Sequence, residues 1–260
     1  MTLFAALLLG GALSVSPTDT VRGLAEADAA FSRIDYPGAL SSYLLALQVS
    51  PEDPENLWKL ARIHVLMYEV APEKEQAALL AHAEEYAYRC ITSDSTVPEG
   101  HTWLAASLAY QALAAGGKEQ LRLSHGLLEE SEKALELNPD DDVAYSIRGS
   151  FFRALGNASW IEKGIAQLFL GDVPDGGYEE SEKALDSAIG LAPDVMRHHY
   201  ELGVLYLDMG RPAEAEGTLR HAATLPVQIA SDWPRLETIR VLLDSGFPDG
   251  GDPTSSETRK

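Results

Sequence analysis

The stretch of this sequence closest to a ligand-binding motif is the DGG turn at residues 175–177, in "GDVPDGGYEESEKAL". A glycine-rich turn before a helix directs free backbone N–H groups, and the positive end of the helix dipole, toward a bound phosphate. A phosphate-binding loop also needs a preceding strand and a Lys-Ser/Thr pair, and this stretch has neither. Glu179 and Glu180 place negative charge where the phosphate would bind, and they suit the dipole of their own helix. We therefore expect a structural turn that leads into a helix.

The histidines and acidic residues do not predict a metal site. The sequence has no HExxH motif, and Asp194 with His198 is the one pair with ligand-like helical spacing. Asp194 is better explained as a cap or dipole partner at a helix start. Adjacent residues on a helix point about 100° apart, so His198 and His199 cannot chelate one ion together. We expect no metal and no cofactor.

No arrangement of nucleophile and base is apparent. Ser150, in "RGSFF", lacks the G-x-S-x-G turn and the strand that precedes it in serine hydrolases. Carboxylate pairs such as Glu129-Glu130 are typical of solvated helix faces. The sequence predicts a protein that is not an enzyme.

The charge balance is strongly acidic and excludes some classes of partner. In 260 residues, 20 Lys and Arg stand against 40 Asp and Glu, which gives a net charge of −20. Nucleic-acid binding needs clustered basic side chains that neutralise phosphates, so we expect no nucleic-acid partner, and anionic membrane surfaces are disfavoured for the same reason. Cys90 is the single cysteine, so an intrachain disulfide or a cysteine-based zinc site is impossible.

The N-terminal segment suggests export. The apolar run from residue 3 to 15 is shorter than the ~20 residues of a membrane-spanning helix and fits a signal peptide over residues 1–16. Ala12-Leu13-Ser14 would serve as the cleavage site, whereas the lack of Lys or Arg before the run counts against this interpretation. We expect a periplasmic or other extracytoplasmic protein with no membrane span once the signal is removed. A membrane-docked segment or a misassigned start, with a cytoplasmic protein, is the alternative.

The sequence repeats itself at a spacing typical of tetratricopeptide repeats. The segments "ALSSYLLALQVSP", "SEKALELNP" and "SEKALDSAIGLAP" each read as a helix that ends at a proline. In "HHYELGVLYLDMGRPAEAEGTLRHAATLP", Gly203 and Leu219 take the small and large positions at which the paired helices of a ~34-residue repeat meet. The small position near the end of each repeat falls on five residues: Ala46, Cys90, Ala134, Ala188 and Ala222.

These anchors define the expected architecture. Their spacings of 44, 44, 54 and 34 residues imply insertions of about ten, ten, twenty and none relative to a ~34-residue repeat, placed between the helices of a unit or extending them. We expect an all-α, right-handed α-solenoid of about five helix pairs over residues 20–243. A capping helix over "WPRLETIRVLLDS" would close the stack, and residues 245–260 would form a disordered acidic and polar tail. Cys90 would then be a buried structural thiol.

Together, several strings give the chain a recognisable family likeness. "LWKLAR", "EGHTWLAASLA", "GKEQLRLS", "ALELNPDD", "LFLGDVPDGGYEESEKAL" and "TLPVQ" resemble the bacterial tetratricopeptide-repeat relatives of the regulator of microtubule dynamics family, over roughly residues 22–243. The resemblance implies a scaffold with no catalytic activity. Microtubule binding is doubtful, because the surface of tubulin is acidic and would repel a chain of charge −20.

In such solenoids the first helix of each pair lines a concave groove, which is the natural place for a peptide or a partner helix. Repeat positions 2, 5, 9 and 12, which we expect to be exposed there, are Asn56, Lys59, Ile63, His101, Leu104, Leu108, Gln111, Ser146, Ser150, Arg153, Arg197 and Tyr200. The basic clamp of chaperone-type repeats is missing, since only Lys59 conforms to it. These residues either bind a protein or peptide partner or simply complete the superhelix.

An accessory carrier is the alternative function. In that case the insertions, with Trp160, would close a pocket of several hundred Å³ around a small or lipidic ligand. Residues 160–170 are the segment we expect to cover one end of the groove.

Overall fold

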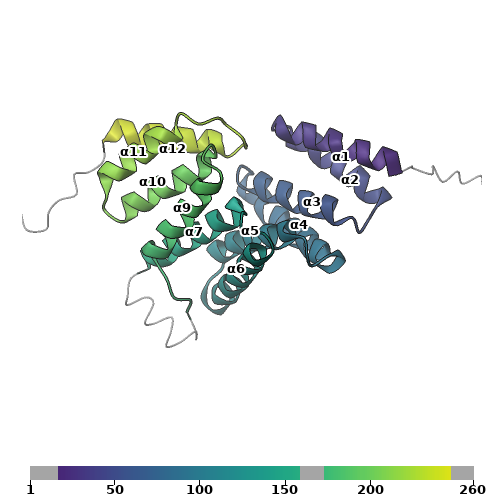
Figure 1. Cartoon of the computed structure of the whole chain (residues 1–260), viewed down its shortest axis with the longest axis horizontal. Coiled ribbons are helices and arrows are strands. Elements are labelled where there is room, and N and C mark those ends of the chain that lie inside the picture. The colour runs from purple at the N-terminus through teal and green to yellow at the C-terminus, as the bar shows by residue number, and fades with distance from the viewer. Residues whose placement is uncertain (1–16, 159–172, 247–260) are drawn as a thin grey trace, which may run out of the picture.

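The computed structural model describes residues 17–158 and 173–246. Within these ranges the chain forms eleven helices and no strand, in agreement with the expected all-α solenoid (Figure 1). The expected signal peptide, residues 160–170 with Trp160, and the tail from residue 247 onward lie outside the described residues. No described helix combines the length and apolar character that crossing a bilayer requires.

The helices are arranged as five antiparallel pairs and a final single helix. The pairs are α1 (Pro17–Ser32) with α2 (Tyr36–Val49), α3 (Pro54–Tyr68) with α4 (Glu73–Ser93), α5 (Pro98–Ala114) with α6 (Gly117–Leu137), α7 (Asp142–Asn157) with α9 (Tyr178–Leu191), and α10 (Met196–Asp208) with α11 (Pro212–Ala222). The last helix is α12 (Asp232–Ser245). The stack is curved, so that the first pair and the last helices face each other at the top of Figure 1, with α5 and α6 below them.

Local sequence signals set the helix starts. Asp53 precedes a proline at the start of α3, and its carboxylate accepts a hydrogen bond from the N–H of Glu55 at 3.2 Å. The Asp141 carboxylate accepts one from the N–H of Ala144 at 2.9 Å at the start of α7. These caps satisfy backbone donors that the first helical turn leaves without a partner.

Two of the predicted insertions lengthen second helices. Helices α4 and α6 have 21 residues each, against 11 in α11, which belongs to the repeat without an insertion. The DGG turn is structural, as expected, since the carboxylate of Glu180 accepts a hydrogen bond from the N–H of Gly177 at 2.9 Å at the start of α9. The Glu180 carboxylate therefore occupies the N-terminus of α9, where an anion could otherwise have bound.

The small residues predicted at the helix seams are buried in every repeat. Ala46 is 5% exposed, and Cys90, Ala134, Ala188 and Ala222 are fully buried. Cys90 Sγ donates a hydrogen bond to the carbonyl of Pro54 at 3.3 Å, and burial raises the pKa of its thiol to about 12. The prediction of a structural thiol is confirmed, because so high a pKa leaves almost no thiolate.

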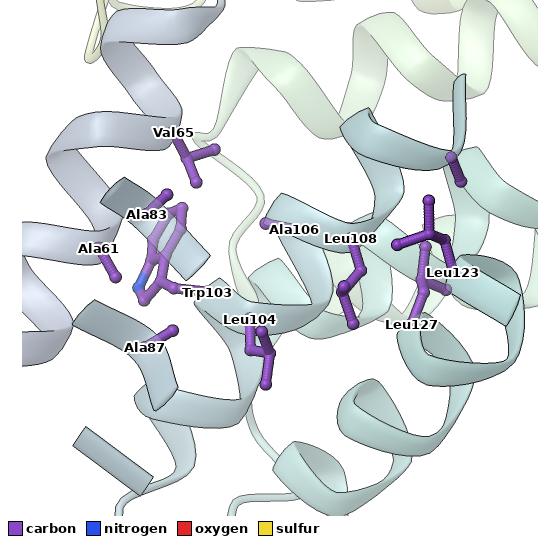
Figure 2. Close-up of a cluster of buried hydrophobic side chains, with 11 residues drawn as sticks. Ala61, Val65, Ala83, Ala87, Trp103, Leu104, Ala106, Leu108, Leu123 and Leu127 are labelled. Carbon is purple, nitrogen blue, oxygen red and sulfur yellow. The ribbon is translucent and has the colours of Figure 1, made fainter. Parts of the chain in front are cut away.

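The central core joins α3, α4, α5 and α6. Figure 2 shows the Trp103 indole between Ala61 and Val65 of α3 and Ala83 and Ala87 of α4. The alanines allow α4 to approach α3 and α5 closely enough to enclose the indole, which is 7% exposed. At the end of the solenoid, Ile239 of α12 is buried against α10 and α11, which confirms the predicted capping helix.

Gly203 tests the packing of the last pair. A Cβ atom at Gly203 would lie 2.6 Å from the side chain of Leu219 on α11, so Gly203→Ala should lower the free energy of unfolding by about 1–3 kcal/mol. Gly217→Ala on α11 is the matched control, because no atom lies within 4 Å of its added Cβ, and it should stabilise by up to about 1 kcal/mol. Urea unfolding of both variants measures the difference. Equal effects at the two glycines would show that the α10–α11 seam is not closely packed.

Candidate functional site

A cavity of about 470 Å³ lies between α5, α6, α7 and α10 and is the candidate functional site. Its walls are mainly apolar and include Trp103, Ala106, Tyr110 and Leu113 of α5, Leu121 and Leu127 of α6, and Ile147 and Phe151 of α7. On α5 the four residues recur every three or four positions, so they form one stripe along the helix. The volume and the apolar lining are typical of sites that bind small molecules or apolar side chains.

Polar groups concentrate on the side of the cavity formed by α7, α10 and α12. Ser146, Ser150 and Arg153 of α7, Arg197 and Glu201 of α10, and Arg235 of α12 line it there. Arg153 donates to Asp208 at 3.0 Å and to Glu201 at 3.3 Å. The buried Nε atoms of Arg153 and Arg197 have no acceptor among the described residues. The site therefore combines mainly apolar walls with one side that carries charged side chains.

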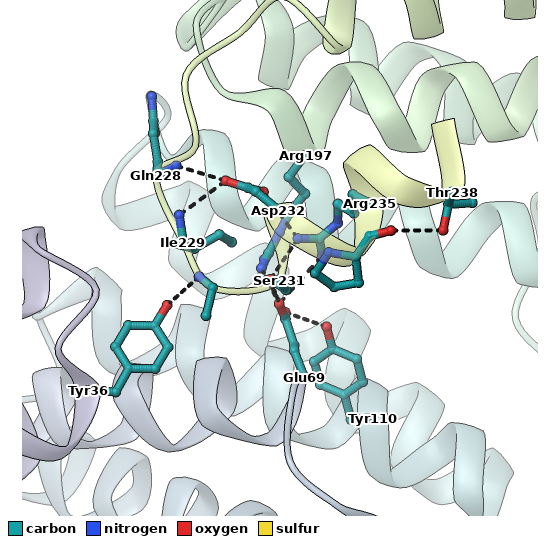
Figure 3. Close-up of polar contacts among 12 residues, drawn as sticks. Tyr36, Glu69, Tyr110, Arg197, Gln228, Ile229, Ser231, Asp232, Arg235 and Thr238 are labelled. Carbon is teal, nitrogen blue, oxygen red and sulfur yellow. Dashed lines mark hydrogen bonds and ion pairs between the residues drawn. The ribbon is translucent and has the colours of Figure 1, made fainter. Parts of the chain in front are cut away.

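The carboxylate of Glu69 joins this polar side to the N-terminal half of the chain (Figure 3). It follows α3, its side chain is 5% exposed, and its two oxygens accept from one guanidinium nitrogen of Arg197 at 2.7 and 2.8 Å. It also accepts from the hydroxyl of Tyr110 at 2.6 Å and from the hydroxyl of Ser231, and it lies 3.5 Å from a guanidinium nitrogen of Arg235. Segments far apart in sequence thus meet at one carboxylate.

The electrostatics of this cluster keep Glu69 ionised. Burial alone would raise the pKa of Glu69, but Arg197 and Arg235 outweigh burial and hold this pKa below its usual value. Burial, and then the negative charge of Glu69, raise the pKa of Tyr110, so its hydroxyl remains a donor. A buried carboxylate that stays charged must keep its cationic partners close, which fixes α10 and α12 against α3.

Four of the predicted groove residues lie around this cavity. Ser146, Ser150 and Arg153 come from α7 and Arg197 from α10, but Ser146 is only 3% exposed, against the expected exposure. Tyr200 instead packs, half-buried, in the apolar cluster that joins α10 to α12.

The predicted groove residues of α3 are not exposed. Ile63 is fully buried in the cluster between α1, α2 and α3, and Asn56 is buried and donates to the carbonyl of Tyr43 at 3.0 Å. Lys59 is 6% exposed, and its ammonium group lies 2.7 Å from Asp28 and 2.6 Å from Glu55. The expected exposure of these three side chains is wrong, because they hold the first pair against α3.

The predicted residues of α5 also point away from the cavity. Leu104 and Leu108 are buried, His101 Nδ1 lies 2.6 Å from Glu130 Oε2, and Gln111 donates to Glu84 at 2.7 Å. The hydrogen bond to Glu130 outweighs burial and raises the pKa of His101. An error of two residues in repeat register rotates a helix face by about 200°, which explains why the opposite stripe of α5 lines the cavity. That any of these residues binds a partner stays a prediction.

Other polar candidates from the sequence have structural roles. His198 Nε2 lies 2.8 Å from the carboxylate of Asp142 rather than beside Asp194. Among the described residues, no three His, Cys, Asp or Glu side chains are grouped so that they could hold a metal ion.

Sequence reasoning missed Glu69, Tyr110 and Arg235. Their partners lie up to 166 positions away, so no local pattern marks them. The one signal was the position of Glu69 in "YEVAP", a single carboxylate in an otherwise apolar stretch at the end of a buried helix.

Removal of the Glu69 charge should destabilise the whole chain. Glu69→Gln leaves Arg197 and Arg235 buried without their counterion, so the free energy of unfolding should fall by about 3–5 kcal/mol. Glu216→Gln is the control, because the Glu216–Arg220 pair on α11 is exposed and should contribute little. Chemical denaturation followed by circular dichroism measures both. A Glu69→Gln variant as stable as the control would contradict the central role of this carboxylate.

The chain is similar in sequence to proteins named regulators of microtubule dynamics. The regulator of microtubule dynamics protein 1 of Bos taurus is 27% identical over 209 residues, which cover 79% of this chain and 66% of the relative. The regulator of microtubule dynamics protein 2 of Mus musculus is 24% identical over 196 residues, 75% of this chain and 48% of that protein. The chain thus spans about half to two thirds of the length of these relatives.

A solved structure shows the same fold. A thermophilic tetratricopeptide-repeat protein of Thermus thermophilus superposes with a TM-score of 0.64 at 21% identity and covers 86% of this chain and 100% of its own. The family model described as regulator of microtubule dynamics protein 1-3 matches residues 24–245. With the helix pairs, insertions and capping helix in place over the same residues, the chain belongs to the regulator of microtubule dynamics protein 1-3 family.

Proposed function

We propose that this chain is a non-enzymatic scaffold that binds a protein partner by taking an apolar segment of that partner into the cavity between α5, α6, α7 and α10. The observation that carries the proposal is the cavity itself, about 470 Å³ with mainly apolar walls. Helix-pair solenoids serve widely as interaction scaffolds, and an apolar concavity with a few polar groups at one side is the usual form of a recognition site.

The polar side of the cavity suggests that the apolar segment of the partner carries a hydrogen-bond acceptor beside it. The Nε–H groups of Arg153 and Arg197 are buried, and no described residue accepts a hydrogen bond from them. The side chain of Arg153 is 25% exposed, so a backbone carbonyl or a carboxylate of the partner could accept from its guanidinium group once the apolar group is bound. The net charge of the chain is −20, but on this wall of the cavity three arginines stand against one acidic residue, Glu201.

The contact we propose is more compact than the extended groove expected from the sequence. The predicted contact residues of α3, and those on the rear of α5, pack within the fold. A partner would therefore contact the central and later repeats rather than run along the full length of the solenoid.

A carrier of a small or lipidic ligand is the second candidate. The volume of the cavity favours it, because small-molecule sites occupy about 300–1,000 Å³. The two candidates differ in what co-purifies with the chain from its own host: a protein in one case and a bound small mass in native mass spectrometry in the other.

Microtubule binding and export have less support. The relatives' names refer to microtubule dynamics, but a net charge of −20 opposes docking on an acidic surface, so we do not propose that role for this chain. The apolar N-terminal segment remains the basis for proposing export.

A residue that fills the cavity tests the proposal. Ala109→Trp places an indole in the cavity from α5, while Ala213→Trp adds the same side chain to the exposed surface of α11. With circular dichroism as the check of folding, crosslinking in host extract should recover a defined partner with the native chain and with Ala213→Trp. Recovery should fall to roughly a tenth or less with Ala109→Trp, a loss equivalent to about 1.4 kcal/mol of binding free energy. Equal recovery with all three proteins would exclude the cavity as the binding site.

A further inference from the structure

The buried serines that line the cavity differ from the other buried serines of the helices. Ser107, Ser131 and Ser181 do not line it, and their hydroxyls donate to backbone carbonyls at 3.1, 3.0 and 2.7 Å. Ser124 of α6 and Ser146 of α7 are 9% and 3% exposed and line the cavity, and their hydroxyls form no hydrogen bond with any described residue. Buried hydroxyls in proteins nearly always have a partner, so these two call for one from outside the chain.

These two hydroxyls lie at the inner end of the cavity. Among the lining residues of α5, the exposed fraction falls from 68% at Leu113 to 7% at Trp103. On α7, Ala154 is exposed whereas Ser146 is buried, and Ser124 of α6 is nearly as buried. The cavity therefore opens beside Leu113 and Ala154, where its walls are apolar, and its free polar groups lie inside.

The walls between the opening and the inner end carry aromatic rings. Trp103 and Tyr110 come from α5 and Phe151 comes from α7. Aromatic rings attract one another in offset-stacked or edge-to-face arrangements, in addition to the burial of their area. Rings on two helices that face one cavity favour an aromatic group as the occupant.

The occupant must also supply hydrogen bonds to the two serines. A group that fills the cavity removes water from their hydroxyls, and a hydroxyl that loses water without gaining a partner lowers the affinity. The arginines of the cavity wall do not make the same demand, because Arg153 and Arg197 already pair with Glu201 and Glu69. An uncharged polar group at the tip of an apolar body meets both requirements.

We propose that the side chain taken into the cavity is a tyrosine of the partner, with its ring against the aromatic walls and its hydroxyl beside Ser124 and Ser146. A phenol hydroxyl donates one hydrogen bond and accepts another, so it can replace water at the serines. Tyrosine is frequent among the residues that anchor protein interfaces. This inference rests on the proposed function, since it names the side chain that the cavity receives from the partner.

The test uses the full chain and two probes, p-cresol and toluene, which are the side chains of tyrosine and phenylalanine without their backbones. Titration followed by saturation-transfer difference NMR gives the affinity for each. p-Cresol should bind at least as tightly as toluene, because the serines replace the water that its hydroxyl loses. In a cavity without free hydroxyls, toluene would bind more tightly, since a buried phenol hydroxyl would have no partner.

The double variant Ser124→Ala/Ser146→Ala removes both hydroxyls and keeps the apolar walls. Its affinity for p-cresol relative to toluene should fall about tenfold, within the range that two neutral hydrogen bonds supply. Ser187→Ala on α9 is the control, because that hydroxyl donates to the carbonyl of Lys183 away from the cavity, and the ratio should not change. Ala109→Trp fills the cavity and should abolish binding of both probes, with circular dichroism as the check of folding.

Three results would overturn the inference: tighter binding of toluene than of p-cresol by the native chain, an unchanged ratio in the double serine variant, or p-cresol binding that survives in Ala109→Trp. The proposed function can fail separately. If the serines confer the preference for p-cresol but Ala109→Trp still recovers the partner from host extract, the proposed function alone is refuted. If Ala109→Trp loses the partner and the native chain does not favour p-cresol, the tyrosine alone is refuted.

Discussion

The buried carboxylate of Glu69 is the interaction on which the closed form of this solenoid depends. Repeat solenoids are held together mainly by contacts between neighbouring units, and their ends are usually independent. Here Arg197 and Arg235, from the last repeats, converge on a residue that belongs to the second pair. Because an ionised carboxylate is costly to bury without its partners, this pairing favours a curved chain whose two ends meet.

The cavity follows from this curvature and from the size of the residues on the inner helices. Ala106 and Ala109 on α5, with Ser146 and Ser150 on α7, leave space where larger side chains would meet. Among the second helices, α6 adds Leu121 and Leu127 to the wall of the cavity. The charged cluster closes one side of that space, so the polar network and the apolar cavity are parts of one site.

The helix pairs could be predicted from the sequence, because they depend on the spacing of residues within one repeat. Proline stops, the glycine of α10 and the alanines at the seams identified the helix pairs, because each acts on a neighbour within the same repeat. The predicted residues of α7 line the cavity, whereas on α5 the lining residues lie two positions further along, and a helix turns about 100° per residue. The cluster at Glu69 and the contact of Ala230 with Tyr36 were not predicted, because Arg197, Ser231 and Arg235 lie more than a hundred positions from Glu69, as Ala230 does from Tyr36.

The distance between the two ends of the solenoid is the most direct test of the role of Glu69. Spin labels at Leu45→Cys on α2 and Val241→Cys on α12, both at exposed positions, allow the distance to be measured by double electron–electron resonance in the full chain. We predict one narrow distance distribution in the native background and a broader, longer one after Glu69→Gln, with circular dichroism confirming that the helices remain. A broad distribution in the native background, or the same narrow one in both, would contradict a solenoid closed by this carboxylate.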